Sequence, residues 1–495
     1  MIEQKPLIDT LQILNQRRTA SALALWKGKA PTVEAYNLYA EYDGFLTLET
    51  LEHIDRELKG DARLRVRHAF VDHYLQQALL PHETEMQTWM HGAAAVVNDE
   101  RIHFRNIIQW CQQPHSHVDR ERLQKETGPL CKFMKPFALN YWEILLELLK
   151  TEFGFPTYID YCREKKGLNY EQYAGLMEHV LEETREIYFN AMQQWAEERI
   201  GLPLERLNRF DSINLFGMHA LDDLLPAGAM ERSLAFFKKW GIYPDKLDGL
   251  HLDIQKDVRK SDQAMSFLLQ IPGEVHVVMN AAGGWIDLET LWHELGHGLS
   301  AVFTSPRIPT VDRELATGYS LSESYAFLLQ NITLSEPFLR GFLGLSKEQA
   351  RKLHYYKTLK DLAALRRYAA KLIAEFRMFD SGSLADGHPY AEIMIQHTGF
   401  YHQPESHLLD LVPEFYCLDY ILGWMGEAAM EDYLVSRFGS DWMFQSAAGD
   451  VLKQWWQQGN QFDIVEFYAK NDLGPLTADL LVKRWKEAFA CFRSN

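Results

Sequence analysis

The stretch that most constrains the fold is residues 287–299, which read DLETLWHELGHGL. It contains the pattern His-Glu-x-x-His, formed by His293, Glu294 and His297. In an α-helix, a spacing of four residues places both histidines on one face, one turn apart. Asp287 is a suitable N-cap and follows a breaker that contains two glycines. The pattern therefore predicts a helix that presents two imidazoles side by side.

Two imidazoles on one helix face can bind a single metal ion. This spacing is the helix-borne zinc motif of metallopeptidases, in which the glutamate, here Glu294, acts as general base. Glu289 lies four residues before His293, where a carboxylate could orient that imidazole. Gly296 and Gly298 lower helix propensity but allow another backbone to approach closely. The alternative is an ordinary amphipathic helix with two histidines at its surface or in the core.

A catalytic zinc site needs a third protein ligand and keeps its fourth position for water. Prolines end the first helix, and a second helix is expected to begin near Ser320 or Ser322, either of which could cap it. The candidate ligands that follow the motif are Asp312, Glu314 and Glu323. Glu323 is favoured because it lies one turn inside a helix that can pack against the first. Glu314, in an expected loop, is the second choice.

The clearest strand pattern is residues 273–280, GEVHVVMN, just before the metal-motif helix. Alternate residues, Val275, Val277 and Met279, would share one face of a strand. The edge of such a strand could pair with an extended peptide. The alternative is a short structural hairpin.

Two tyrosines stand out in residues 406–424. Tyr416 and Tyr420 would lie one turn apart on a helix, so that both phenols could point the same way. A phenol hydroxyl can donate a hydrogen bond to a developing oxyanion. The alternative is a pair of tyrosines on a half-buried helix.

Helical periodicity dominates the chain. Residues 62–80 and 170–199 space their apolar residues at three and four, as amphipathic helices do. We therefore expect a mainly α protein with a small β-strand element beside the metal-motif helix. We expect an N-terminal helical lobe, 1–210, and a catalytic domain, 211–495. The lobe would either wall a cleft or serve as scaffold only.

Composition narrows the class of protein. The 495 residues are 47% hydrophobic and carry a formal net charge of −17, which makes nucleic acid an unexpected partner. No apolar run approaches the length of a membrane span, and the N-terminal stretch lacks the apolar core of a signal peptide. The five cysteines show no paired spacing, which suggests reduced thiols and a cytoplasmic protein.

These residues together resemble the M3 oligopeptidase and M32 carboxypeptidase group of glutamate-ligand zincins, relatives of the angiotensin-converting-enzyme family. The M3 pattern resembles residues 287–299 at nearly every position, including the glutamate that matches Glu289. The run LDIQKDVRKSDQAMSF, residues 252–267, is similar to the segment that precedes the M3 site.

Other segments resemble the M32 family. Residues 322–324 followed by Gln330 are similar to its third-ligand segment, although a glutamate stands there where this chain has Gln330. The pattern Tyr-x-x-x-Tyr-x-Leu-Gly of residues 416–423 resembles the segment that carries the two family tyrosines. A family histidine that precedes them has its nearest counterpart in His407, displaced by one residue.

The resemblance covers about residues 251–331 and 405–433. It implies a nearly all-helical, two-lobed ellipsoid with a deep active-site cleft, and Zn²⁺ held by His293, His297 and Glu323. It implies hydrolysis of short unstructured peptides, with Glu294 as base. Oxyanion stabilisation would come from the remaining candidates, namely Tyr416, Tyr420 and His407.

Two alternatives remain. A carboxypeptidase would need a cation to bind the free carboxylate of its substrate, and Arg366, Arg367 and Arg377 are candidates. A helical binding protein without turnover is the more remote alternative. An intact Glu294 argues against it, because a merely structural metal site needs no base.

Overall fold

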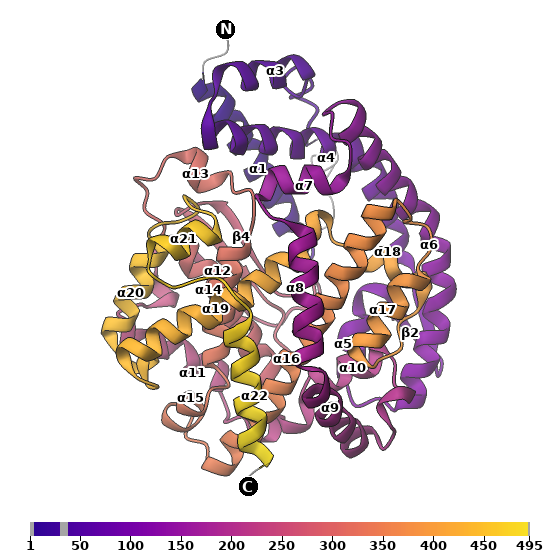
Figure 1. Ribbon diagram of the computed structural model, residues 1–495, viewed down its shortest axis with the longest axis vertical. Coiled ribbons are helices and arrows are strands. Elements are labelled where there is room, and N and C mark those ends of the chain that lie inside the picture. The colour runs from indigo at the N-terminus through magenta and orange to yellow at the C-terminus, as the bar shows by residue number, and fades with distance from the viewer. Residues whose placement is uncertain (1–3, 30–37, 494–495) are drawn as a thin grey trace. The chain divides into compact units, whose positions relative to one another are not determined.

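The computed structural model describes residues 4–29 and 38–493. It is 70% helical, and its described residues form 21 α-helices and two small sheets of two and three strands (Figure 1). The prediction of a mainly α protein is therefore confirmed.

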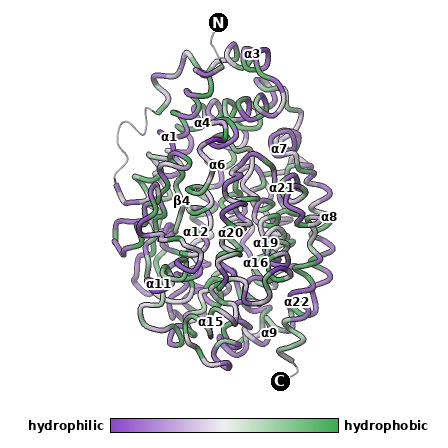
Figure 2. Tube along the Cα trace, turned by 90° about the vertical axis from the view of Figure 1, so that its left-hand side faces the viewer, coloured by the Kyte–Doolittle hydropathy of each residue, from purple (hydrophilic) through white to green (hydrophobic). Residues whose placement is uncertain are grey.

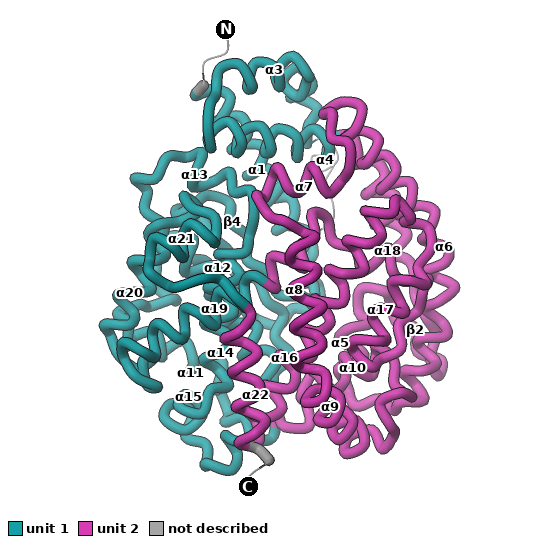
Figure 3. The backbone as a smooth tube through the Cα atoms, viewed as in Figure 1, with its two compact units in different colours: residues 1–77, 223–351, 422–477 teal, residues 78–222, 352–421, 478–495 magenta. Residues whose placement is uncertain are grey.

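The chain forms two compact units, each assembled from three segments (Figure 3). Unit 1 comprises Met1–Gln77, Asp223–Arg351 and Leu422–Thr477, and unit 2 comprises Ala78–Asp222, Lys352–Ile421 and Ala478–Asn495. Neither unit coincides with the expected N-terminal lobe.

The reason is visible at the first helix, α1 (Gln4–Trp26). The indole of Trp26 packs edge-on against Phe267, with ring centroids 5.9 Å apart, and its Nε1 donates to Gln263 O at 2.8 Å. Tertiary contacts of this kind join the start of the chain to residues far along the sequence, which helical periodicity cannot show.

Unit 1 contains the helix that carries the metal motif, and most of its helices lie wholly within it. Those helices, besides α1, are α3 (Leu48–Glu57), α11 (Ala229–Ser233), α12 (Trp285–Phe303), α13 (Thr310–Glu314), α14 (Ser320–Ile332), α15 (Glu336–Gly341), α20 (Ser446–Trp456) and α21 (Ile464–Lys470). Three further helices run from one unit into the other along the chain: α4 (Gly60–Gly92), α16 (Lys347–Ser381) and α19 (Tyr416–Phe438).

The sheet of unit 1 has the strand order β3-β5-β4. Strand β3 (Leu250–Asp253) pairs parallel with β5 (Glu274–Val278), and β4 (Met265–Gln270) pairs antiparallel with β5. The strand expected at 273–280 is therefore present as β5. The expectation that it offers an edge to a peptide is wrong, because β5 has a neighbour on both sides. The edge strands are β3 and β4.

The packing of α12 depends on small residues. A Cβ atom added to Gly296 would lie 2.4 Å from the Cα of Ala326 on α14, and one added to Gly298 would lie 3.0 Å from a methyl group of Val277 on β5. Any side chain at Gly296 would push α14 away, because a contact that short is not tolerated between carbon atoms. Glycine thus allows α12 and α14 to touch backbone to backbone.

Among its described residues, unit 2 has one hairpin, in which β1 (Ala94–Val97) pairs with β2 (Glu100–His103), and is otherwise built from helices and their connections. Its helices, besides the shared ones, are α5 (Ile107–Gln112), α6 (His117–Thr151), α7 (Tyr158–Lys166), α8 (Tyr170–Glu183), α9 (Arg185–Ile200), α10 (Arg209–Phe216), α17 (His388–Thr398), α18 (His407–Asp410) and α22 (Asp479–Arg493).

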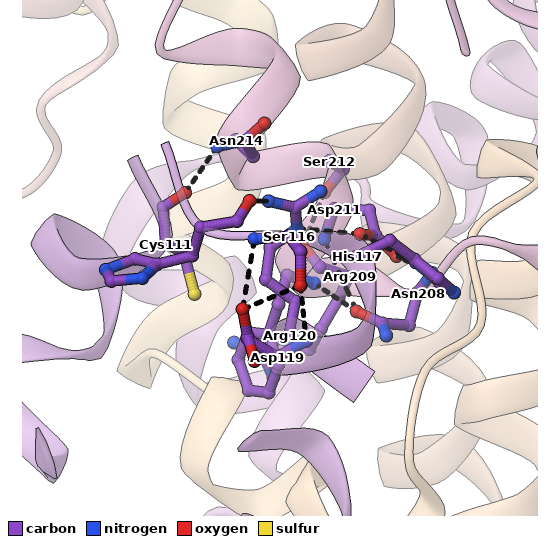
Figure 4. A network of polar contacts seen from close by, with 12 residues as sticks. Cys111, Ser116, His117, Asp119, Arg120, Asn208, Arg209, Asp211, Ser212 and Asn214 are labelled. Atoms are coloured by element: carbon purple, nitrogen blue, oxygen red, sulfur yellow. Dashed lines mark hydrogen bonds and ion pairs between the residues drawn. The ribbon is translucent and has the colours of Figure 1, made fainter. Parts of the chain in front are cut away.

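A buried carboxylate ties α6 to α10 (Figure 4). Asp211 is fully buried and accepts a hydrogen bond from Arg120 Nε at 2.7 Å. It also accepts from the main-chain N–H of Asn208 at 2.9 Å, and His117 Nδ1 lies 3.1 Å away. The same carboxylate therefore completes the capping box of α10 and neutralises a buried arginine on α6.

Hydrophobic and hydrophilic residues alternate along the helices of the trace (Figure 2). Across residues 4–29 and 38–493, no helix combines the length and the apolar character needed to cross a membrane.

Arg366, on α16, is fully buried and holds two helix ends together. Its Nη1 donates to Leu181 O at 2.6 Å and to Thr184 Oγ1 at 2.7 Å, at the end of α8. Its Nε donates to His397 O at 3.0 Å, at the end of α17. A cation at helix C-termini satisfies carbonyls that have no partner within the helix and interacts favourably with the helix dipole.

We predict that Arg366→Met lowers the free energy of unfolding by about 3 kcal/mol or more, because buried acceptors lose their donors. Arg377→Met on the same helix is the control. Arg377 pairs with Glu178 at 2.8 Å through side chains that are 60% and 53% exposed, and such pairs contribute about 0–1 kcal/mol. Urea unfolding followed by circular dichroism measures the free energy of unfolding of both variants. Equal losses in the two variants would contradict the role given to Arg366.

Candidate metal centre

Three ligand atoms converge where α12 meets α14. His293, His297 and Glu323 each offer one atom, and these atoms lie within 4.8 Å of one another. The Nε2 atoms of His293 and His297 lie 3.5 and 3.7 Å from Glu323 Oε2. The predicted helix and the choice of Glu323 both agree with this geometry. Among the described residues, this is the one His/Cys/Asp/Glu group that could hold a metal ion.

The start of the motif helix differs from expectation. Helix α12 begins at Trp285 with Gly284 in the N-cap position, so Asp287 lies in the first turn and is not the N-cap. The Asp287 carboxylate accepts from the main-chain N–H of Gly283 at 2.5 Å. It therefore stabilises the helix start by bonding back to the preceding turn.

A hydrogen bond at Nδ1, the ring nitrogen that does not face Glu323, sets the tautomer of His293. Gln330 Nε2 donates to Glu289 Oε1 at 2.9 Å, so the amide oxygen of Gln330 is the atom that faces His293. His293 Nδ1 lies 2.9 Å from that oxygen and must donate to it. The lone pair of His293 consequently resides on Nε2, the atom directed toward Glu323.

His297 has an equivalent support on the second helix. Its Nδ1 lies 2.8 Å from Ser322 Oγ, which leaves Nε2 directed toward Glu323. Burial lowers the pKa of His293 to about 4, a shift that the hydrogen bond with Gln330 opposes, and lowers the pKa of His297 well below its usual value. Both imidazoles are therefore neutral near pH 7, which is the state that binds metal.

Glu289 acts on His293 indirectly. The sequence predicted that this carboxylate would orient the imidazole itself. In the structure, Gln330 lies between the two side chains and bonds to each. Glu289 is buried, and its interaction with Gln330 fixes which way the amide points.

Glu294 follows His293 on α12, and its carboxylate is bound by a residue of β4. Ser266 Oγ is 2.8 Å from Glu294 Oε2 and 3.0 Å from Glu294 O, and the hydroxyl donates to these acceptors. Burial raises the pKa of Glu294 to about 7, against the hydrogen bond from Ser266, which lowers it. A carboxylate with a pKa near neutrality is suited to general acid–base chemistry.

The other candidate third ligands lie elsewhere in unit 1. The Glu314 carboxylate accepts from the main-chain N–H of Ile271 at 3.2 Å and pairs with Arg313 at 3.4 Å. Asp312 pairs with Arg65 at 3.5 Å. The Glu314 carboxylate therefore stabilises the turn between β4 and β5. The Asp312 carboxylate contributes to the packing of α13.

The remaining candidates belong to unit 2. Tyr416 and Tyr420 lie one turn apart at the start of helix α19 and are half-buried, with ring centroids 5.1 Å apart. His407 is fully buried, with Nδ1 2.7 Å from Pro404 O and Nε2 2.8 Å from Leu384 O. Both of its ring nitrogens are engaged by main-chain carbonyls, so His407 has a structural role and is not retained as a site residue.

Sequence reasoning missed three supporting residues: Ser266, Ser322 and Gln330. The sequence offers Ser322 as a helix cap and as part of a segment similar to a family pattern, and Gln330 as a departure from that pattern, but assigns neither a contact with a histidine. Ser266 lies in β4, and nothing in its local sequence indicates that its side chain reaches Glu294. Only the pairing of β4 with β5 and the packing of α12 on the sheet bring it there.

A comparison of the chain with known protein families found no matching family, and a comparison with curated proteins found no similar protein.

We predict that Glu323→Ala abolishes tight metal binding, because a two-histidine site lacks the third ligand. Glu314→Ala should retain about one metal ion per chain, as a three-ligand site does. Metal analysis after dialysis of the purified proteins measures both. Retention of metal by Glu323→Ala, with loss from Glu314→Ala, would show that the third ligand is misassigned.

Proposed function

We propose that the protein is a zinc metallopeptidase that hydrolyses short unstructured peptides. The observation that carries the proposal is the convergence of His293, His297 and Glu323, together with the buried glutamate Glu294, which follows His293 in the chain. Two imidazoles and one carboxylate form a donor set used for catalytic zinc. When bound, zinc polarises a carbonyl group and lowers the pKa of water.

Glu294 is the proposed general base. It would accept a proton from the attacking water and transfer it to the leaving amine. Ser266 would keep the carboxylate in one orientation throughout, since its hydroxyl bonds to both a side-chain and a main-chain oxygen of Glu294. A base fixed in this way loses little entropy on reaching the transition state.

Tyr416 and Tyr420 are the proposed oxyanion donors. A phenol hydroxyl is a strong donor that carries no charge, so it can stabilise a developing negative charge without competing for the metal. The resemblance to the M32 segment supports this role. His407 has no part in it, because its ring nitrogens are engaged inside unit 2.

An extended peptide would pair with an edge strand of the sheet in unit 1, which means β3 or β4 and not β5. Strand β4 is the better choice, since its Ser266 contacts the proposed base.

The carboxypeptidase alternative gains no support from its candidate cations. Arg366 donates to main-chain carbonyls, Arg367 pairs with Asp410 at 2.6 Å, and Arg377 pairs with Glu178. Endopeptidase action is therefore the primary proposal. A binding protein without turnover would have no need of Glu294.

We further propose that the protein works in the cytoplasm. All five cysteines are free thiols and four of them are buried, as expected where thiols remain reduced.

We predict that Glu294→Gln folds and binds zinc but loses turnover on the order of 10³-fold, because an amide cannot accept the proton. Glu314→Gln is the control, since it makes the same chemical change to another buried carboxyl group of unit 1 and should retain activity. Peptide cleavage assayed with and without a chelator measures both. Activity of Glu294→Gln within about tenfold of the parent would exclude this residue as the base.

We predict cleavage of peptides of roughly five to fifteen residues at internal bonds, with native globular proteins left intact. Mass spectrometry of peptide digests reports the sites. Stepwise loss of C-terminal residues, abolished by amidation of the C-terminus, would instead assign the protein as a carboxypeptidase.

A further inference from the structure

Helix α19 begins with an unusual backbone. Glu414, with φ 61° and ψ 32°, and Phe415, with φ 49°, both adopt the left-handed conformation immediately before Tyr416. This conformation is unfavourable for residues that carry a side chain. Two such residues in succession persist only where the surrounding structure holds them.

Glu414 is held from α7 by three side chains. Lys165 Nζ donates to Glu414 Oε1 at 2.6 Å, and Lys166 Nζ donates to the Glu414 carbonyl oxygen at 2.7 Å. The main-chain N–H of Glu414 donates to Tyr158 Oη at 2.5 Å. The side chain and both main-chain polar groups of Glu414 are therefore bound to one helix.

Phe415 is held by aromatic packing. It is buried, and its ring centroid lies 4.6 Å from Tyr170, 5.4 Å from Phe379 and 5.8 Å from Tyr158. These three rings come from α8, α16 and α7. The backbone before Tyr416 is therefore fixed by both polar and apolar contacts.

Lys166 extends the attachment into α19 itself. Its Nζ donates to Asp419 Oδ2 at 2.6 Å, and the two side chains are 2% and 1% exposed. Burial lowers the pKa of Lys166, but the carboxylates of Asp419 and Glu414 outweigh it and raise the pKa overall. Buried ion pairs contribute little to stability on balance, and their best-supported use is to fix geometry.

Asp419 lies between the two tyrosines in the first turn of α19. The ammonium of Lys166 therefore connects Glu414, two residues before the helix, to that turn. The same Nζ lies 6.0 Å from the ring centroid of Tyr416. The ring of Tyr416 packs on that of Tyr420, which in turn packs on Tyr368 at 4.8 Å. The position of both rings therefore depends on where α19 begins.

We propose that Lys166 and Glu414 are positioning residues that orient the phenols of Tyr416 and Tyr420 for oxyanion stabilisation. The inference rests on the proposed peptidase function. A fold that needed only a sharp helix start could place glycine at position 414, where it would adopt the left-handed conformation without cost. A glutamate bound by two lysines fixes the direction in which α19 leaves the turn, as well as the turn itself.

Glu414→Gly is the primary test, because it relieves the backbone strain and removes the contact with Lys165. We expect kcat to fall roughly 10- to 100-fold, as for small misplacements of catalytic groups. KM should stay within about threefold, and zinc content and the thermal midpoint should not fall. Glu414→Gln keeps the oxygen that accepts from Lys165 and should restore kcat to within about threefold of the parent.

The double variant Lys166→Met/Asp419→Asn tests the ion pair by removing both of its charges together. Its kcat should fall about as far as that of Glu414→Gly, and its zinc content should not change. Arg120→Met/Asp211→Asn is the matched control, because it removes a buried ion pair from the same unit at α6 and α10 (Figure 4). The control should keep kcat within about threefold of the parent.

A Glu414→Gly variant with the kcat of the parent would overturn the positioning role while the peptidase proposal stands. Equal losses in Glu414→Gln and Glu414→Gly would overturn it as well. A parent chain that binds zinc and cleaves no peptide would overturn the peptidase proposal, and the positioning role of Lys166 and Glu414 with it. If the double variant does not fold, the two Glu414 variants decide.

Discussion

The close contact between α12 and α14 is the constraint on which the candidate centre depends. Gly296 allows the two backbones to meet, and that contact brings Glu323 opposite His293 and His297. Gly423 on α19 serves the same purpose on the other side, since a Cβ atom there would lie 2.6 Å from the Cβ of Glu323. The third ligand is therefore positioned by two glycines that have no chemistry of their own.

Burial then determines the electrostatics of the centre. Removing imidazoles and carboxyl groups from water disfavours their charged forms, so the two histidines stay neutral and the pKa of Glu294 rises to about 7. Each group is supported by a polar neighbour: Gln330 for His293, Ser322 for His297, and Ser266 for Glu294. Buried polar groups that are supported in this way keep a single orientation, which both metal binding and proton transfer require.

In unit 2, charged side chains that are buried are held by specific polar neighbours in the same way. Arg366 caps the ends of two helices, Asp211 joins α6 to α10, and Lys166 joins the residues before α19 to its first turn. In each case a buried charged group is bound by specific polar partners, and removing one partner leaves a buried polar group unsatisfied. Such contacts make an arrangement of helices specific, which apolar packing alone does less well.

The sequence by itself determined what depends on local spacing. The helical periodicity, the motif helix with His293 and His297, and the strand before it all follow from patterns within a few residues. Tertiary structure decided the rest. Whether Glu323 or Glu314 meets the histidines, that β5 is central, and that Ser266 contacts Glu294 all depend on contacts between segments distant in sequence. The division into two units and the structural role of His407 depend on such contacts too. Hydrophobic periodicity specifies which face of an element is buried, but not which element covers it.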